Sequence, residues 1–297
     1  MLIYFDTSNL INITERADPC DILGLRRLLM AGQHRLVLSM NTILELSEPL
    51  LNRHASTNVT ALLNRLESLP HVFVNASRIS KLELEQAVKA FFEGKEYEFV
   101  TPPFVARFDE TVDLNAKPPT RVFLNYSLAE TIWDLFNVGA LAHQEIFPVK
   151  LKEAFALDRN GSPKPTLRQH FRTVIKRKLA MNRIGVLDGE ADALADWIYA
   201  TPSRCPAIRL GYELWHKMIK NVGDQPRASD IEDFHHLDCA PYVDMITMDR
   251  RMHGYLMQVG VSIGVDYGSK AFRETTDVLK KIHSYNESVH WIEYFPQ

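Results

Sequence analysis

Short apolar runs alternate with longer segments of helical apolar spacing, and this alternation predicts an α/β fold. Residues 2–5 (LIYF) are typical of a buried strand, because the run is too short for a helix and rich in strand-forming residues. The polar residues 6–9 (DTSN) then supply turn and helix-capping chemistry. Residues 34–51 repeat this order, with a strand at 36–38 and a helix that contains Glu45. A strand–helix–strand–helix order predicts a central parallel sheet flanked by helices.

Further elements follow the same two patterns. Apolar residues at helical spacing predict helices at residues 21–33, 58–68, 80–93 and 229–240. Extended segments are predicted at residues 71–76 and 242–249, and the second of these ends on Asp249. The aromatic tail at residues 290–295 (HWIEYF) is predicted to be a packing strand.

The middle of the chain is richer in proline loops and helical patterns than the segments on either side. Proline-rich loops are indicated at residues 101–108, 116–121 and 161–165, and helical patterns at 127–147 and, as one long segment, around 166–199. We therefore expect an α/β domain in two pieces, residues 1–96 and 201–297, interrupted by a mainly helical insertion at 97–200.

Composition excludes several classes of protein. The three cysteines among 297 residues lack CxxC spacing, which argues against a disulfide framework and a zinc site and fits a reducing compartment. No signal peptide is visible, and no apolar run approaches the roughly 18 residues that a membrane helix needs. A soluble, cytoplasmic protein is expected. The net charge of −3 requires any nucleic-acid surface to be a local patch, and no glycine-rich nucleotide loop is present.

Five carboxylates are predicted to meet at one edge of the sheet. Asp6 and Asp249 each follow a strand, Glu45 lies in the helix after the second strand, and Asp230 and Asp233 begin the helix before Asp249. Function collects at the carboxyl ends of parallel strands, where neighbouring elements bring such residues together. Crowded carboxylates need a cation, and oxygen ligands suit Mg²⁺ or Mn²⁺, which can activate water to attack a phosphodiester. Taken singly, each acid also fits an ordinary turn, cap or solvated helix position.

Three segments resemble the acidic motifs of the PIN-domain nuclease family: IYFDTSNLI, LVLSMNTILELSEP and SDIEDFHHLDCAPYVDMITMDRRM. Asp6, Glu45 and Asp249 match the family's acids position by position. The third acid is either Asp230 or Asp233, which spacing does not separate, and Asp244 is an outside candidate. The resemblance covers about residues 1–95 and 205–260.

The resemblance implies a PIN-like fold and a Mg²⁺- or Mn²⁺-dependent endonuclease that cleaves RNA in preference to DNA. The implied metal-binding and catalytic residues are Asp6, Glu45, Asp230, Asp233 and Asp249. Glu45 would bind the metal or orient the attacking water, and Thr7 or Ser8 would fix the carboxylate of Asp6 by hydrogen bonding. The resemblance allows two protein partners, a second copy of the chain and a cognate inhibitor protein. It also allows a role in a toxin–antitoxin or defence system. No membrane partner is expected.

Basic residues supply candidate phosphate contacts. Arg250 and Arg251 follow Asp249 directly, and the basic stretch 168–183 places Arg172 and Lys176 on one helix face. The same stretch also fits a solvated helix face. A second acidic group at residues 188, 192 and 196 reads as one side of an amphipathic helix, and His235 and His236 are expected to have structural or supporting roles.

Two alternatives remain beside the nuclease. A phosphotransferase with an aspartyl intermediate also places an Asp after the first strand, but its second Asp normally lies two residues on, where this chain has Ser8. The other alternative is a catalytically inactive PIN-like fold that serves as a binding or scaffold module.

Overall fold

The computed structural model describes residues 1–14, 19–46, 59–74, 76–99, 103–111, 128, 153, 156–160, 166–224, 227 and 230–294. The described strands are β1 (Leu2–Tyr4), β2 (Arg35–Ser39), β3 (His71–Val74), β4 (Phe104–Val105), β5 (Met245–Thr247) and β6 (Ala271–Phe272). The described α-helices are α1 (Thr7–Thr14), α2 (Pro19–Ala31), α3 (Met40–Leu46), α5 (Val59–Glu67), α6 (Ala76–Phe92), α9 (Leu167–Met181), α10 (Asp188–Ala200), α11 (Pro206–Lys220), α12 (Asp230–Leu237), α13 (Arg250–Ile263) and α14 (Thr275–Tyr294). Short 3-10 turns lie at η1 (Phe108–Thr111), η2 (Pro202–Arg204) and η3 (Ala240–Tyr242).

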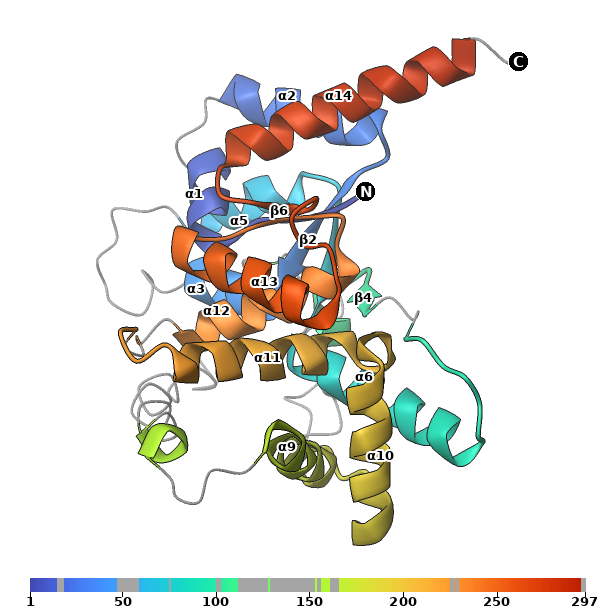
Figure 1. The fold of residues 1–297 in the computed structure, drawn as a ribbon. Coiled ribbons are helices and arrows are strands. Elements are labelled where there is room, and N and C mark those ends of the chain that lie inside the picture. Colours follow the sequence, from blue (N-terminus) through green and yellow to red (C-terminus); the bar gives the residue numbers. More distant parts are fainter. Residues whose placement is uncertain are drawn as a thin grey trace.

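A six-stranded sheet forms the centre of the fold, and its strands lie in the order β4-β3-β2-β1-β5-β6 (Figure 1). β1 pairs in parallel with β2 and β5, with Ile3 opposite Leu36 and Met245. β6 continues the parallel arrangement at one edge, whereas β4 is antiparallel to β3 at the other. The predicted α/β class, with a mostly parallel sheet flanked by helices, is confirmed.

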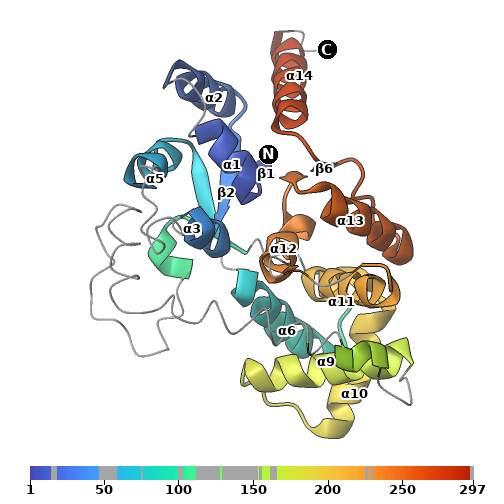
Figure 2. The same ribbon diagram turned by 90° about the vertical axis from the view of Figure 1, so that its left-hand side faces the viewer.

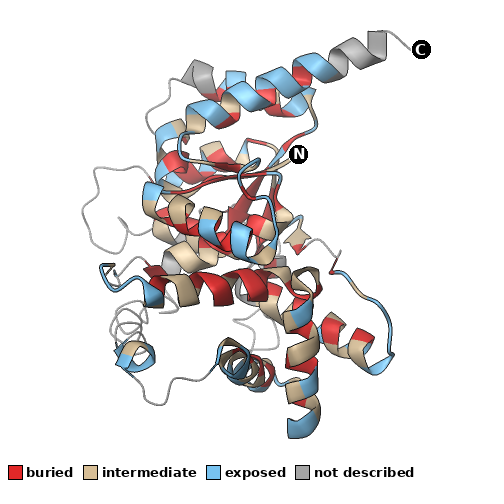
Figure 3. Cartoon of the chain, in the orientation of Figure 1, coloured by how far each residue is buried: buried red, intermediate tan, exposed pale blue. Residues whose placement is uncertain are grey.

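Each face of the sheet has its own apolar core (Figure 3). Ile3 and Phe5 join the cluster that α1, α2, α5 and α14 cover, while Tyr4 between them joins the cluster under α11, α12 and α13. Leu36 and Val37 divide between the two faces in the same way. Alternate residues of a strand point to opposite faces, so a strand covered on both sides reads as one continuous apolar run.

The long helical pattern predicted around residues 166–199 is two packed helices, α9 and α10, rather than one. Asn182 ends α9, and Arg183 adopts the left-handed φ of 57° that turns the chain. A third apolar cluster lies where these helices meet α6 and α11, and it includes Phe171 and Leu194. Figure 2 shows this helical layer below the sheet.

The helices predicted at residues 21–33, 58–68, 80–93 and 229–240 are found as α2, α5, α6 and α12. The predicted loop at 101–108 contains β4, whose two residues join the sheet from within the segment assigned to the insertion. The predicted helix at 127–147, apart from residue 128, and the loops at 116–121 and 161–165 lie outside the described residues.

The prediction of a strand at residues 290–295 is wrong, because α14 continues to Tyr294. Val278, Ile282 and Asn286 are buried at a spacing of four residues, which places them on one face of the helix, and α14 packs against α2. A helix anchored in this way extends readily into the aromatic residues that follow, because each added residue gains a backbone hydrogen bond.

No helix within the described ranges combines the length and apolarity needed to cross a lipid bilayer.

Candidate active site

The carboxyl edge of the sheet brings together the elements that carry the predicted acids. Asp6 follows β1, and Asp249 follows β5, which pairs directly with β1. α3 carries Glu45 and packs against α12, which begins with Asp230 and Asp233 (Figure 2). Residues from distant parts of the sequence therefore gather beside the central strand.

Asp6 is held in place by donors from its own turn and from β5. Its Oδ1 accepts hydrogen bonds from the backbone and side-chain nitrogens of Asn9, at 2.9 and 2.5 Å, and Ser8 Oγ lies 3.4 Å from each carboxylate oxygen. Thr247 Oγ1 accepts from the backbone N–H of Asp6 at 2.9 Å. Asn9 in turn accepts a hydrogen bond from Thr275, the first residue of α14. The position of the Asp6 carboxylate is thus fixed by three elements besides β1.

Glu45 lies in a buried hydrogen-bond network rather than in solvent. Its Oε1 is 3.0 Å from His236 Nε2, and its Oε2 accepts a hydrogen bond from the hydroxyl of Thr7. The other ring nitrogen of His236 bonds the hydroxyl of Tyr4, which is fully buried and also bonds Ser39 and Thr42 at 3.0 and 2.9 Å. The hydroxyl of Thr7 therefore contacts Glu45, whereas the hydroxyl of Ser8 is the one beside Asp6.

Glu45 and His236 stabilise each other's charged forms. Burial alone would raise the pKa of Glu45, but the hydrogen bonds and positive charge of His236 outweigh it and lower the pKa. Burial alone would lower the pKa of His236, but the negative charge of Glu45, followed by those of Asp233 and Asp6, raises it. The imidazole therefore lies within electrostatic reach of three of the predicted acids.

Asp230 is fully buried, and its charge is compensated by an arginine. Arg251 donates to both of its carboxylate oxygens and also bonds Asp224 at 2.8 Å. The backbone N–H of Arg227 adds a hydrogen bond to Asp230 at 2.8 Å. Arg251 is thus committed to an internal ion-pair network, and its neighbour Arg250 is the one exposed to solvent.

Asp233 contrasts with Asp230, one turn earlier on the same helix. It is half-buried, and within the described residues it has no hydrogen bond or ion pair. Burial, followed by the negative charge of Asp249, raises the pKa of Asp233 to about 7. Asp249 is exposed, and its Oδ1 caps α13 by accepting from the backbone N–H of Met252 at 2.7 Å. The positive charges of His236 and Arg251 act on Asp233 as well, but they do not offset its burial and the repulsion by Asp249.

The chemistry of these donors fits a hard divalent metal, since each offers carboxylate oxygens. Within the described residues, however, no three or more His, Cys, Asp or Glu side chains are arranged to hold an ion as they stand. Asp233 has both oxygens without a protein partner in these ranges, and Asp249 has one outside its cap. Binding an ion here therefore requires the side chains to reorient.

The predicted basic surface on α9 is paired internally. Arg168 and Arg172 both donate to Asp196 of α10, at 2.7 and 2.9 Å, and Lys176 lies 3.0 Å from Asp192. The hydrogen bond from Arg172 is the main cause that lowers the pKa of Asp196 to about 2. The basic face of α9 and the acidic face of α10 thus neutralise each other across the helix pair.

Arg273 is a candidate that the sequence analysis missed. It follows β6, whose Phe272 pairs with Thr247 of β5, so it lies at the same edge as Asp249. The side chain is exposed and has no ion pair within the described ranges. No signal in the sequence marks it, because a strand of two residues gives no periodicity.

The expected structural or supporting role of His236 does not specify its partner, although the sequence carries a signal for its position. His236 lies three residues after Asp233, which places both on one face of α12.

Comparison with models of protein families, with curated proteins and with solved structures found no significant match to the chain.

Proposed function

We propose that this protein is a metal-dependent nuclease with a PIN-like fold, which hydrolyses phosphodiester bonds of nucleic acid, RNA in preference to DNA. The observation that carries the proposal is the acidic pair of Asp233 and Asp249 beside Asp6 at the carboxyl edge of the sheet, where burial and the charge of Asp249 outweigh the charges of His236 and Arg251 and raise the pKa of Asp233. The adjacent acids each have a direct ion pair, Asp230 with Arg251 and Glu45 with His236, whereas Asp233 has none within the described residues. The acids that remain are those a bound metal would compensate.

Asp6, Asp233 and Asp249 would hold Mg²⁺ or Mn²⁺, with their side chains turned toward the ion. When bound, the metal supplies an activated water and neutralises charge on the phosphate. The protein's own part is to fix these carboxylates. Asn9 and Thr247 position Asp6, while the start of α13 positions Asp249.

The substrate must bring its negative phosphates to an acidic edge, so nearby cations are needed. Arg250 and Arg273 are the exposed arginines that flank this edge on the β5–β6 side. We assign the phosphate contacts to these two residues. Arg251, Arg172 and Lys176 are occupied by carboxylates of the protein itself.

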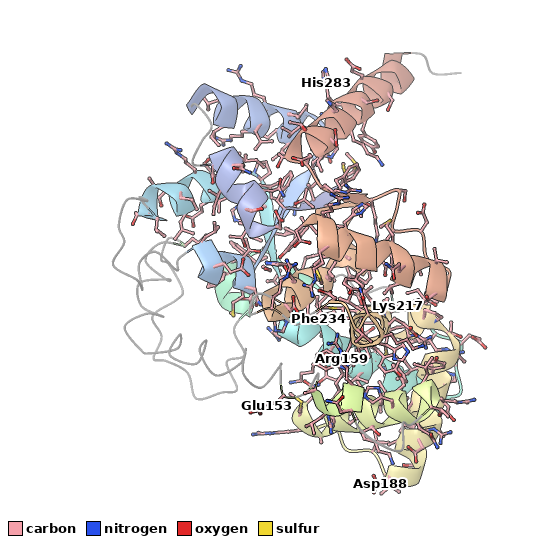
Figure 4. All side chains as sticks on the ribbon, turned by 60° about the vertical axis from the view of Figure 1, so that its left-hand side comes forward. Glu153, Arg159, Asp188, Lys217, Phe234 and His283 are labelled. Atoms are coloured by element: carbon pink, nitrogen blue, oxygen red, sulfur yellow. The ribbon has the colours of Figure 1, made fainter. Side chains whose placement is uncertain are left out.

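The direct test is cleavage of labelled single-stranded RNA and DNA with added Mn²⁺ or Mg²⁺. We expect wild type to cut RNA, and Asp6→Asn, Asp233→Asn and Asp249→Asn to fall to the level of an EDTA control. The matched control is Asp188→Asn, which removes the charge of an exposed carboxylate at the far end of α10, remote from Phe234 of α12 (Figure 4). This variant should cut as fast as wild type.

The second candidate function is a binding or scaffold module with the same fold. It is favoured by the lack, in the described residues, of a preformed group of metal ligands. If it is correct, wild type cuts neither polymer and binds no Mn²⁺ in calorimetric titration.

A further inference from the structure

One arginine of the insertion is bound to the end of α11. Residues 156–160 are exposed except for Arg159, which is half-buried. Its guanidinium donates hydrogen bonds to four backbone carbonyls where α11 ends and the next turn begins. These carbonyls belong to Met218, Ile219, Asn221 and Asp224, at 3.1, 3.2, 3.0 and 2.6 Å respectively. The last carbonyls of a helix have no partner within the helix, so Arg159 supplies the donors that α11 lacks.

A second residue fixes the same segment to the helical layer. Asp158 Oδ2 accepts a hydrogen bond from the indole N–H of Trp215 on α11 at 2.8 Å, and it lies 4.0 Å from Nε2 of His170 on α9. Figure 1 shows this light-green segment below the end of α11. The insertion is therefore attached on both sides of Arg159's contact with α11, by α9 and by residues 156–160.

The side chain of Asp224 continues the connection toward the sheet. Its carboxylate accepts a hydrogen bond from Nε of Arg251 at 2.8 Å, and Arg251 donates in turn to the carboxylate of Asp230, the first residue of α12. The backbone of Asp224 is thus held by Arg159 and its side chain by α13. One series of contacts runs from the insertion through Asp224 and Arg251 to the start of α12.

We propose that Arg159 is a positioning residue that couples the insertion to α12: when residues 156–160 are released, the turn at Asp224 loosens and the start of α12 loosens with it. The side chains of Arg251 and Asp230 are only 13% and 0% exposed, so water cannot replace either partner when the other moves. A shift of Asp224 and Arg251 therefore has to move Asp230 as well. This coupling goes beyond the proposed function and requires no bound metal.

Hydrogen exchange of the full chain in EDTA, followed by mass spectrometry, tests the coupling. Arg159→Gln removes the charge and most of the donors, so amides at the end of α11 and in α12 should exchange about tenfold faster or more, with β2 unchanged. Asp224→Asn keeps the backbone carbonyl for Arg159, so exchange should rise in α12 but not at the end of α11. The double variant should exchange no faster in α12 than Arg159→Gln, because both substitutions break one series of contacts.

The matched control is Arg168→Gln, which removes an exposed arginine of the insertion that pairs with Asp196. Exchange in α12 should then match wild type. The proposal is overturned if Arg159→Gln accelerates exchange at the end of α11 alone, because Arg159 would then be only a helix cap. Equal acceleration in β2 would overturn it too, since the whole fold would have lost stability.

Arg159→Lys decides the matter if Arg159→Gln does not fold. Lysine keeps the positive charge at the end of α11 but lacks the planar fork of donors that reaches several carbonyls at once. We expect this variant to accelerate exchange in α12 by several-fold, again with β2 unchanged. Wild-type exchange rates in α12 of Arg159→Lys would overturn the proposal.

Discussion

Asp233 and Asp230 show how two acids one helical turn apart acquire different roles. Asp230 is fully buried against Arg251, whereas Asp233 has no partner in the described ranges and carries a pKa raised to about 7. The sequence offered both as the third acid, because spacing along the chain does not show which of them meets an arginine 21 residues away.

The raised pKa of Asp233 predicts a pH-dependent affinity for metal. Only the ionised carboxylate is a ligand, and a pKa of about 7 leaves most of it protonated below neutrality. We expect the affinity for Mn²⁺ to rise about tenfold between about pH 6 and about pH 8. Calorimetric titration at both values measures this, and Asp233→Asn should remove the dependence. An equal slope in that variant would contradict the prediction.

Arg251 and Arg250 are adjacent, but we expect their substitution to have very different effects on the free energy of unfolding. Arg251→Ala leaves the buried carboxylate of Asp230 without its cation, so we expect a loss of about 3–5 kcal/mol in the free energy of unfolding. Arg250 is exposed and unpaired within the described chain, and Arg250→Ala should change that free energy by less than about 0.5 kcal/mol. Denaturant unfolding in EDTA compares the two variants. A loss of stability in Arg251→Ala as small as that in Arg250→Ala would show that Arg251 does not support Asp230.

At the scale of elements, the pairing of α9 with α10 changes the expected nucleic-acid surface. The basic face of α9 forms ion pairs with the acidic face of α10 in the same chain. Exposed pairs of this kind add little stability, so their main consequence is that few charges remain for phosphate.

The salt dependence of RNA binding distinguishes the two basic surfaces. Each phosphate contact on a single strand contributes about 0.7 to the slope of log affinity against log salt. We expect Arg250→Ala/Arg273→Ala to lower the slope by about 1.4, and Arg172→Ala/Lys176→Ala to lower it by much less. All variants are compared in the Asp6→Asn background, which prevents cleavage. If Arg172→Ala/Lys176→Ala lowers the slope more, the RNA contacts α9 rather than the edge of the sheet.

Glu83 joins three elements and predicts a pH dependence of folding. It is fully buried on α6 and accepts hydrogen bonds from the backbone nitrogens of Ala207 and Ile208, in the first turn of α11, and from the hydroxyl of Tyr242. Burial outweighs these bonds and raises its pKa from 4.5 to about 7. The folded state therefore holds this proton more tightly than the unfolded state does.

The stability contributed by Glu83 is accordingly present below pH 4.5 and is lost as the pH rises to about 7. Relative to Glu83→Gln, the free energy of unfolding of wild type should fall by roughly 3 kcal/mol across this range. Denaturant unfolding at several pH values measures the difference. Parallel profiles for the two proteins would contradict the prediction.

At the scale of the whole molecule, the central strands could be predicted and the edges could not. β1, β2 and β5 are buried on both faces, so each reads as a continuous apolar run. β4 and β6 contain two residues each and are defined only by their neighbours. Asp6 and Asp249 could be predicted from strand ends and the other candidate acids from helix positions, but the partners that distinguish them come from remote positions, such as Arg251 for Asp230 and His236 for Glu45.

The ion pair of Asp230 with Arg251 also restricts how this sequence can diverge. Losing either partner leaves an uncompensated charge in the interior, whereas losing both leaves an apolar gap that other side chains can fill. Among descendants of this chain, the two positions should therefore change together. Asp249 also caps α13, so the stability of that helix is enough to keep it. Asp233 has no hydrogen bond or ion pair within the described residues, so selection for a ligand would explain its retention. Covariation of Asp230 with Arg251 and retention of Asp233 would thus record folding and function separately.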